Sequence, residues 1–299
     1  MSFIFFIYMI SFNNCPICSS SAIREFKKIK SFTLFKCNDC NIVFLNPKLE
    51  PDELSKYYDE HYYSDIAYKE NAINLNEYDA SINYNLEQFE KRFGKKKSLL
   101  EIGAGCGYFL NSAKKYGYNV EGIEISDFGC KFAKDNFNLN LFQGDVTTFS
   151  TNKTYDLIYM SHSLEHMDNP LEVLKKAYSM LNNNGVLWTI VPNYKSIERY
   201  LQNENWEAWS LPYHLFHFEP KTLKSVITKA GFDIISIERT FYSPSKILKN
   251  FISIETNQQY SPSTELNQVK RMKTIKNLIK KPLTLILPGT NLSAYAIKK

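Results

Sequence analysis

From residue 98 onward, short apolar segments alternate with amphipathic segments. Nearly continuous apolar runs such as Val186–Val191 are typical of strands that are buried on both faces of a parallel sheet. Segments such as Tyr108–Tyr116 carry apolar side chains at helical spacing, so we expect them to cover that sheet. Strands that alternate with helices of this length predict right-handed βαβ units and an α/β fold with a doubly wound sheet. The predicted strands are Leu99–Ile102, Val120–Glu124, Leu141–Phe142, Tyr155–Met160, Val186–Val191 and Phe232–Arg239, and the predicted helices are Tyr108–Tyr116, Asp127–Asn136, Pro170–Leu181 and Pro220–Ala230.

The residues before this alternation have other patterns. Residues 3–10 are all apolar, but the run is too short to cross a bilayer core, which needs roughly 20 residues. We therefore expect residues 1–12 to be an apolar leader, with contact to a membrane surface or a partner as the alternative. Residues 46–97 are expected to form a helical connector that includes a helix over Asp79–Phe93. Its tyrosines predict either a packing surface or a lid over a ligand: Tyr57, Tyr58, Tyr62, Tyr63 and Tyr68.

Four cysteines between the leader and the connector form two Cys-x-x-Cys pairs. Cys15 and Cys18 make the first pair, and Cys37 and Cys40 make the second. Two pairs at this separation have the spacing of a structural zinc site, because each pair supplies one edge of a tetrahedron. Apolar residues between the pairs suit a short hairpin, so we predict a zinc ribbon over residues 13–45. Four protein ligands leave no open position on the metal, which predicts a structural role.

The end of the chain gives weaker signals. The main domain is expected to span residues 98–299, with a helical insertion at 241–288 before a last strand at Leu292–Ile297. Within the insertion, Lys270–Lys281 mixes basic and apolar side chains as in an amphipathic helix. Such a helix packs on its own domain with solvated lysines, or lies on an anionic membrane surface.

Composition excludes several classes of protein. The chain has 299 residues, of which 44% are hydrophobic and 22% charged, as in globular proteins rather than disordered ones. A net charge of +5 spread over this length gives no reason to expect a nucleic-acid partner. Six cysteines are too few for a disulfide scaffold. We expect a cytoplasmic enzyme without a transmembrane segment and make no prediction of its oligomeric state.

The loop after the first predicted strand is rich in glycine. Gly103, Gly105 and Gly107 follow the strand directly and precede a helix, so the backbone can approach a ligand at the positive end of that helix. Tyr108 stands where a dinucleotide-binding motif has its third glycine, which argues against a nicotinamide cofactor. Glu124 ends the next strand, where a carboxylate can accept both hydroxyls of a ribose.

These features together resemble the class I S-adenosylmethionine-dependent methyltransferases, from about Leu99 to Val191. The Glu-x-Gly-x-Gly-x-Gly loop, the acidic strand end at Glu124, and the Gly144-Asp145 pair occur in the order of that family. With the two cysteine pairs, the chain is similar to zinc-ribbon methyltransferases of surface polysaccharide or secondary-metabolite synthesis. The resemblance implies a seven-stranded Rossmann-like sheet and S-adenosylmethionine as cofactor. It implies cofactor contacts for Glu101, Gly103, Gly105, Gly107, Glu124, Ile125, Asp145, Val146, Met160 and His162.

Histidines gather where the chemistry is expected. His162, Glu165 and His166 follow the fourth predicted strand, and His214 lies after the fifth. A neutral hydroxyl must lose its proton as it attacks a sulfonium methyl, so His162 or His214 is the predicted base. Glu165 and His166 are further catalytic candidates, with local hydrogen bonding at the start of a helix as the alternative. We expect Pro192–Phe218 to build the acceptor pocket, with Trp206, Trp209 and Tyr213 either stacking on the acceptor or covering the sheet edge.

A divalent metal is an additional candidate at the same segment. In the ubiquinone-pathway and small-RNA methyltransferases, a similar segment reads Glu-x-x-Glu-His and binds a divalent cation. This chain has His162 in place of the first glutamate, so the resemblance carries over only Glu165 and His166, with His214 as a further ligand. His162 to His166 also matches an inverted zinc-protease motif, but that motif needs both histidines on one helix.

The most specific hypothesis from the sequence is methyl transfer from S-adenosylmethionine to a small molecule. The expected acceptor is a hydroxyl of a nucleotide-linked sugar in surface polysaccharide or secondary-metabolite synthesis. C-methylation of a keto-sugar and methylation of RNA are the alternatives.

Overall fold

The computed structural model describes residues 9–50, 53–54, 75–240 and 289–299. The proposed tyrosine lid, residues 1–8 of the expected leader, and the expected helical insertion at 241–288 with its basic segment lie outside the described residues. Among the helices within the described part, none is long and apolar enough to cross a membrane.

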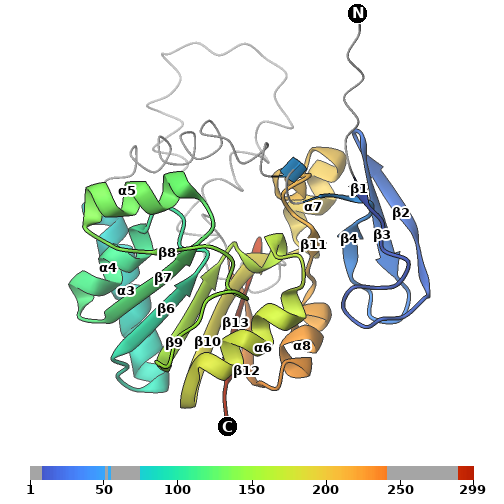
Figure 1. The fold of residues 1–299 in the computed structure, drawn as a ribbon. Helices are drawn as coiled ribbons and strands as arrows, with labels where there is room; N and C mark the ends of the chain where they lie inside the picture. Colours follow the sequence, from blue (N-terminus) through green and yellow to red (C-terminus); the bar gives the residue numbers. More distant parts are fainter. Residues whose placement is uncertain (1–8, 51–52, 55–74, 241–288) are drawn as a thin grey trace, which may run out of the picture.

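A seven-stranded sheet forms the centre of the molecule (Figure 1). Its order is β12-β13-β10-β9-β6-β7-β8, and β13 runs antiparallel to both of its neighbours. The order reverses between β6 and β9, which creates the switch point where α/β sheets bind ligands. The predicted sheet and its antiparallel last strand are confirmed. The strands are β6 (Ser98–Ile102), β7 (Asn119–Glu124), β8 (Phe142–Gln143), β9 (Tyr155–Ser161), β10 (Leu181–Pro192), β12 (Asp233–Thr240) and β13 (Asn291–Ile297).

Helices cover both faces of this sheet, because successive strand residues point to opposite sides. Leu99 of β6 belongs to the apolar core beneath α3 and α4, and Leu100 belongs to the core beneath α6 and α8. Both leucines are fully buried. The four helices predicted after residue 98 are confirmed to within one residue at their ends, whereas the short α7 was not predicted. The helices are α3 (Leu75–Phe93), α4 (Tyr108–Tyr116), α5 (Asp127–Phe137), α6 (Pro170–Met180), α7 (Ile197–Gln202) and α8 (Pro220–Lys229), with the 3-10 turns η1 (Leu164–His166), η2 (Asn203–Asn205) and η3 (Glu207–Trp209).

A second sheet carries the cysteine pairs and lies beside α7 in Figure 1. The predicted hairpin is present, and its sheet has the order β11-β4-β3-β2. The fourth strand, β11, comes from the segment just before α8, so the cysteine-bearing segment is joined to the main domain by backbone hydrogen bonds. The buried residues of this sheet continue into the core under α6 and α8. Its strands are β2 (Ile23–Ile29), β3 (Phe32–Cys37), β4 (Val43–Leu45) and β11 (Phe216–His217), while β1 (Met9–Ile10) pairs with β5 (Lys48–Leu49).

Candidate functional site

The glycine loop leaves β6 in a conformation that other residues adopt only with strain. Gly103, Gly105 and Gly107 have φ angles of 77°, 53° and 78°. At Gly103 there is a second constraint, since a Cβ atom there would lie 2.5 Å from the Cβ of Ser163. The Ser163 hydroxyl in turn donates a 2.9 Å hydrogen bond to the carbonyl of Ile102. The glycine loop therefore lies directly against the segment that carries His162, Glu165 and His166.

Glu124 holds the other side of this loop. Its carboxylate is 5% exposed and accepts hydrogen bonds from the backbone N–H groups of Gly105, at 2.7 Å, and Ser126, at 2.8 Å. Helix α5 also packs tightly against the glycine loop. A Cβ atom on Gly129 would lie 2.8 Å from the carbonyl oxygen of Gly105. Gly129 was not selected from the sequence, since a lone glycine inside a predicted helix gives no sign of close approach.

The remaining residues expected at the cofactor differ in exposure. Ile125 is 64% exposed beside Glu124, so its side chain presents an apolar surface to solvent. Asp145 is exposed and accepts a 2.7 Å hydrogen bond from the N–H of Thr147. The side chains of Glu101, Val146 and Met160 are buried.

The histidine segment lies at the carboxyl end of β9, next to the glycine loop. His162 has a φ of 51°, and its Nδ1 lies 3.4 Å from a carboxylate oxygen of the fully buried Glu165. The ligand atoms of Glu165, His166 and His214 all lie within 4.8 Å of one another. The rings of His166 and His214 meet edge to face with their centres 4.6 Å apart. The structure therefore brings together the four residues predicted to be catalytic.

The electrostatics of this cluster favour neutral rings around a carboxylate. Burial lowers the pKa of His166 to about 3 and also lowers the pKa of His214. Burial alone would raise the pKa of Glu165, but contact with His162 and the nearby rings keeps it below its usual range. The Nδ1 atom of His214 is 2.9 Å from the carbonyl of Ala208, so that nitrogen carries the proton and Nε2 is available to the cluster. Neutral imidazoles and an ionised carboxylate are the forms that bind a divalent cation or accept a proton.

Trp206 and Trp209 are not stacking platforms. They are 4% and 3% exposed and form an edge-to-face pair 5.2 Å apart in the core shared with the second sheet. The Trp209 indole also donates a 2.7 Å hydrogen bond to the carbonyl of Asn203. Their predicted stacking on an acceptor is wrong, because both side chains are used in packing.

The family model for a methyltransferase domain matches residues 74–237, which is more than half of the chain. The chain belongs to this methyltransferase family. The match includes the glycine loop, Glu124 and the histidine segment, and it ends within β12. The methyltransferase domain also has the seven-stranded sheet expected for class I S-adenosylmethionine-dependent enzymes.

Similar proteins support the same assignment. Over 106 residues the chain is 30% identical to malonyl-[acyl-carrier protein] O-methyltransferase 1 of Ilyobacter polytropus, covering 33% of this chain and 40% of that protein. Over 107 residues it is 30% identical to a ubiquinone biosynthesis O-methyltransferase of Actinobacillus pleuropneumoniae, covering 32% and 45% of the two chains. The chain thus spans less than half the length of either relative. A plantazolicin methyltransferase crystallised with S-adenosylhomocysteine and a substrate analogue has the same fold, with a TM-score of 0.52, 20% identity, and coverage of 84% of this chain and 92% of that one.

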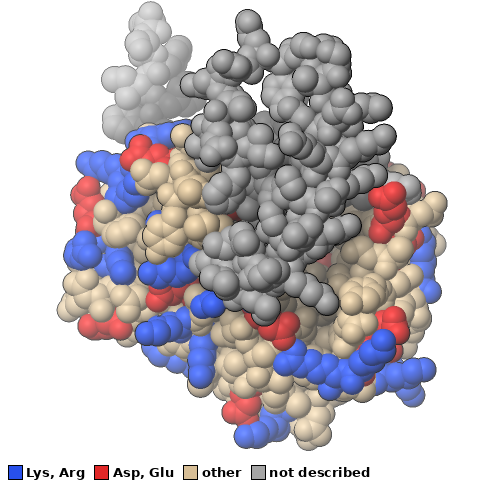
Figure 2. Space-filling model, turned by 180° about the vertical axis from the view of Figure 1, so that it is seen from behind, with Lys and Arg blue, Asp and Glu red and all other residues tan. Residues whose placement is uncertain are grey.

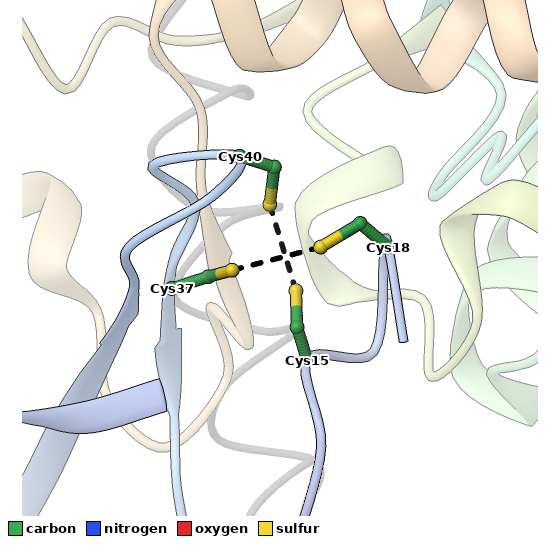
Figure 3. Close-up of side chains that lie close together, drawn as sticks. All are labelled: Cys15, Cys18, Cys37 and Cys40. Carbon is green, nitrogen blue, oxygen red and sulfur yellow. Dashed lines mark hydrogen bonds between the residues drawn. The ribbon is translucent and has the colours of Figure 1, made fainter. Parts of the chain in front are cut away.

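The four cysteines attached to the methyltransferase domain converge on one point (Figure 3). The sulfurs of Cys15 and Cys40 are 3.5 Å apart, and those of Cys18 and Cys37 are 3.6 Å apart. Four thiolates about 2.3 Å from a tetrahedral zinc ion would be separated by about 3.8 Å. The donor set and its spacing therefore fit a structural zinc ion, and the predicted zinc ribbon agrees with the geometry.

Proposed function

We propose that this chain transfers the methyl group of S-adenosylmethionine to a hydroxyl of a small molecule, most specifically a nucleotide-linked sugar. The contact between Gly103 and Ser163 supports this proposal most directly. It brings the loop that would hold the methionine part of the cofactor against the segment with His162, the more exposed of the two candidate bases. A methyl donor and a proton acceptor at one edge of the sheet are what methylation of a hydroxyl needs.

The cofactor site would use residues that the structure leaves at the carboxyl ends of the strands. Bound S-adenosylmethionine supplies an electrophilic methyl group on its sulfonium. Glu124 would hold the ribose hydroxyls, Asp145 and the Val146 backbone would bind the adenine, and Ile125 would pack on the adenine ring. The exposure of Ile125 suits such a contact, because covering 64% of an aliphatic side chain removes apolar surface from water.

Two side chains can take the proton from the acceptor. The His162 side chain is 34% exposed and is oriented by Glu165, so it can reach a bound hydroxyl. The Nε2 atom of His214 faces the same cluster but lies deeper. We therefore propose His162 as the base and assign His214, Glu165 and His166 to orienting it or to holding a cation.

A divalent cation fits this cluster. Glu165, His166 and His214 would supply one oxygen and two nitrogens, and the buried Glu165 carboxylate is contacted by His162 Nδ1 only at 3.4 Å, without a well-formed hydrogen bond among the described residues. A cation there would lower the pKa of the acceptor hydroxyl. Without the cation, His162 can still take the proton, so the proposed methyl transfer does not depend on a bound metal.

The relatives and the surface charge both favour a small-molecule acceptor. Relatives of this chain are named as methyltransferases of malonyl-[acyl-carrier protein], of ubiquinone biosynthesis and of (S)-coclaurine, which favours a metabolite over a nucleic acid. Basic and acidic side chains are interspersed over the coloured part of the face in Figure 2, which does not favour an RNA acceptor. A cytoplasmic role in polysaccharide or secondary-metabolite synthesis is consistent with such an acceptor. For the domains, we propose an apolar leader, a zinc ribbon, a helical connector and a methyltransferase domain, in that order.

An acceptor screen tests this proposal. Zinc-replete protein would be incubated with S-adenosylmethionine carrying a tritiated methyl group, and with nucleoside diphosphate sugars, keto-sugar nucleotides or ribosomal RNA. We expect label in a hydroxyl-bearing sugar nucleotide, lost in His162→Asn and retained in Asn140→Asp on the far side of the domain. Label at carbon in a keto-sugar, or in RNA alone, would establish one of the alternatives instead.

A further inference from the structure

The cysteine-bearing sheet is hydrogen-bonded directly to the backbone of the candidate catalytic cluster. The N–H of Leu45, in β4, donates a 2.9 Å hydrogen bond to the carbonyl of Leu215. The N–H of Leu215 donates a hydrogen bond of the same length to the carbonyl of Glu165. Leu215 stands next to His214, so one residue of backbone connects β4 to both the glutamate and the histidine of the cluster.

A second connection reaches His214 from the other side. The Lys27 ammonium, in β2, donates a 2.9 Å hydrogen bond to the side chain of Asn203 and lies 3.3 Å from the carboxylate of Glu204. The backbone carbonyl of Asn203 accepts the indole N–H of Trp209. Trp209 follows Ala208, whose carbonyl is the hydrogen-bond partner of His214 Nδ1. The segment that fixes the tautomer of His214 is therefore held against the hairpin.

The second cysteine pair lies at the turn that leads into β4, the strand that contacts Leu215. Cys37 ends β3, and its N–H donates a 3.0 Å hydrogen bond to the carbonyl of Ile42, just before β4. Cys40 lies within that turn, so ligation of Cys37 and Cys40 by one metal ion would fix the turn between the strands. Val43 of β4 is then paired with His217, and Phe44 with Phe216.

We propose that the zinc ribbon positions the catalytic cluster, so that metal ligation by the four cysteines holds His214 in the tautomer protonated at Nδ1. The ribbon acts through Leu45 on Leu215 and Glu165, and through Lys27 on the segment containing Ala208. The cofactor loop is held by Glu124 and Gly129 from the opposite half of the sheet, and it contacts the histidine segment at Ser163, which neither connection from the ribbon includes. Loss of zinc then disturbs the histidine cluster and leaves cofactor binding intact. This inference rests on the proposed function for its catalytic meaning, but its structural content can be measured without an acceptor.

Nuclear magnetic resonance of the histidine rings tests the inference on the full chain. The sequence has five histidines, so a ¹⁵N-histidine-labelled sample gives few signals, and His214→Gln identifies the one of interest. Spectra would be compared for the zinc-replete wild type, Cys37→Ser and Lys27→Ala. Lys28→Ala is the matched control, because Lys28 is the next residue in β2 and its side chain is 69% exposed. Calorimetric titration with S-adenosylhomocysteine would be run on each sample.

We expect wild-type His214 to show the pattern of a ring protonated only at Nδ1. Cys37→Ser and Lys27→Ala should lose this single-tautomer pattern without loss of affinity for S-adenosylhomocysteine, and Lys28→Ala should keep both. An unchanged His214 signal in the zinc-free Cys37→Ser protein would overturn the inference. So would a parallel loss of cofactor affinity in Cys37→Ser and Lys27→Ala, because zinc would then stabilise the whole fold. Failure of the wild type to bind S-adenosylhomocysteine would instead contradict the proposed function.

Discussion

Gly103 and Ser163 lie so close that a Cβ atom on the glycine would be 2.5 Å from the Cβ of the serine. The two residues are far apart in sequence and belong to the loops after β6 and β9. Their contact couples the shape of the proposed cofactor loop to that of the histidine segment. Side chains of ordinary size are therefore excluded from this position for two independent reasons, the clash and the positive φ of 77°.

Gly103→Ala should weaken binding of S-adenosylhomocysteine at least about tenfold, which corresponds to about 1.4 kcal/mol. The added methyl group must displace Ser163, which carries the hydrogen bond to Ile102, and so distorts the loop. Calorimetry measures the affinity. Gly94→Ala is the matched control, since Gly94 has a φ of 75° but nothing within 4 Å of the added Cβ. Affinity in Gly103→Ala equal to that of Gly94→Ala and of the wild type would contradict a role for the contact with Ser163.

Acid should destabilise the fold in part through His217. Burial lowers the pKa of His217 to about 3, and its ring packs on Trp209. A histidine whose folded pKa lies below its unfolded value of about 6.5 contributes its full stability above pH 6.5 and loses it as the pH falls towards 3. Lowering the pH from 7.5 to 5.5 should reduce the free energy of unfolding by about 1.4 kcal/mol through this residue.

Urea unfolding at the two pH values measures this effect. In His217→Phe the decrease in stability between pH 7.5 and 5.5 should be smaller than in the wild type by that amount. His61→Phe, which changes a histidine elsewhere in the sequence, serves as the control. An identical pH dependence for the wild type and His217→Phe would show that folding does not lower the pKa of His217.

Purified protein should contain one zinc ion per chain, bound by the four clustered cysteines. Cys18→Ser should abolish stoichiometric binding, because it removes one of the four tetrahedral ligands. Cys130→Ser should leave the zinc content unchanged, since the Cys130 sulfur lies by the carbonyl of Glu124 and outside the cluster. Elemental analysis by mass spectrometry gives the content directly. Full zinc content in Cys18→Ser would contradict the ribbon.

A divalent cation at the histidine cluster can be tested without an acceptor. Mn²⁺ added to zinc-replete protein should bind at one site, observed as loss of the free Mn²⁺ electron paramagnetic resonance signal. Glu165→Gln should abolish this binding, because it removes the only carboxylate of the cluster. Glu172→Gln should retain it, since that residue is exposed on α6 and pairs with Lys175. Binding that survives Glu165→Gln would place the cation elsewhere.

Much of the fold could be predicted from the sequence because its signals are local. The helix over Tyr108–Tyr116 and the strand ending at Glu124 have the periodicity and end signals that short-range physics requires. The spacing of the two Cys-x-x-Cys pairs likewise indicates one shared metal site. These features need no knowledge of the tertiary structure.

The features that the sequence did not predict depend on distant residues. Nothing local in Leu45 or Leu215 indicates that β4 pairs with β11. Trp206 and Trp209 are buried in a core that also contains residues of the cysteine-bearing sheet, which composition cannot show. Gly129 contacts the glycine loop, which is distant in sequence, so the sequence alone could not distinguish it from an ordinary helix residue.

The central claim is that this site binds the methyl-transfer cofactor through Glu124, and calorimetry tests it most directly. Zinc-replete wild-type protein, Glu124→Gln and the control Glu121→Gln would each be titrated with S-adenosylhomocysteine and with NAD. Glu121 lies on the same strand and pairs with Lys153, away from the glycine loop. We predict binding of S-adenosylhomocysteine to the wild type and Glu121→Gln, weaker binding by about tenfold or more in Glu124→Gln, and no binding of NAD. Binding of NAD in place of S-adenosylhomocysteine would contradict the account.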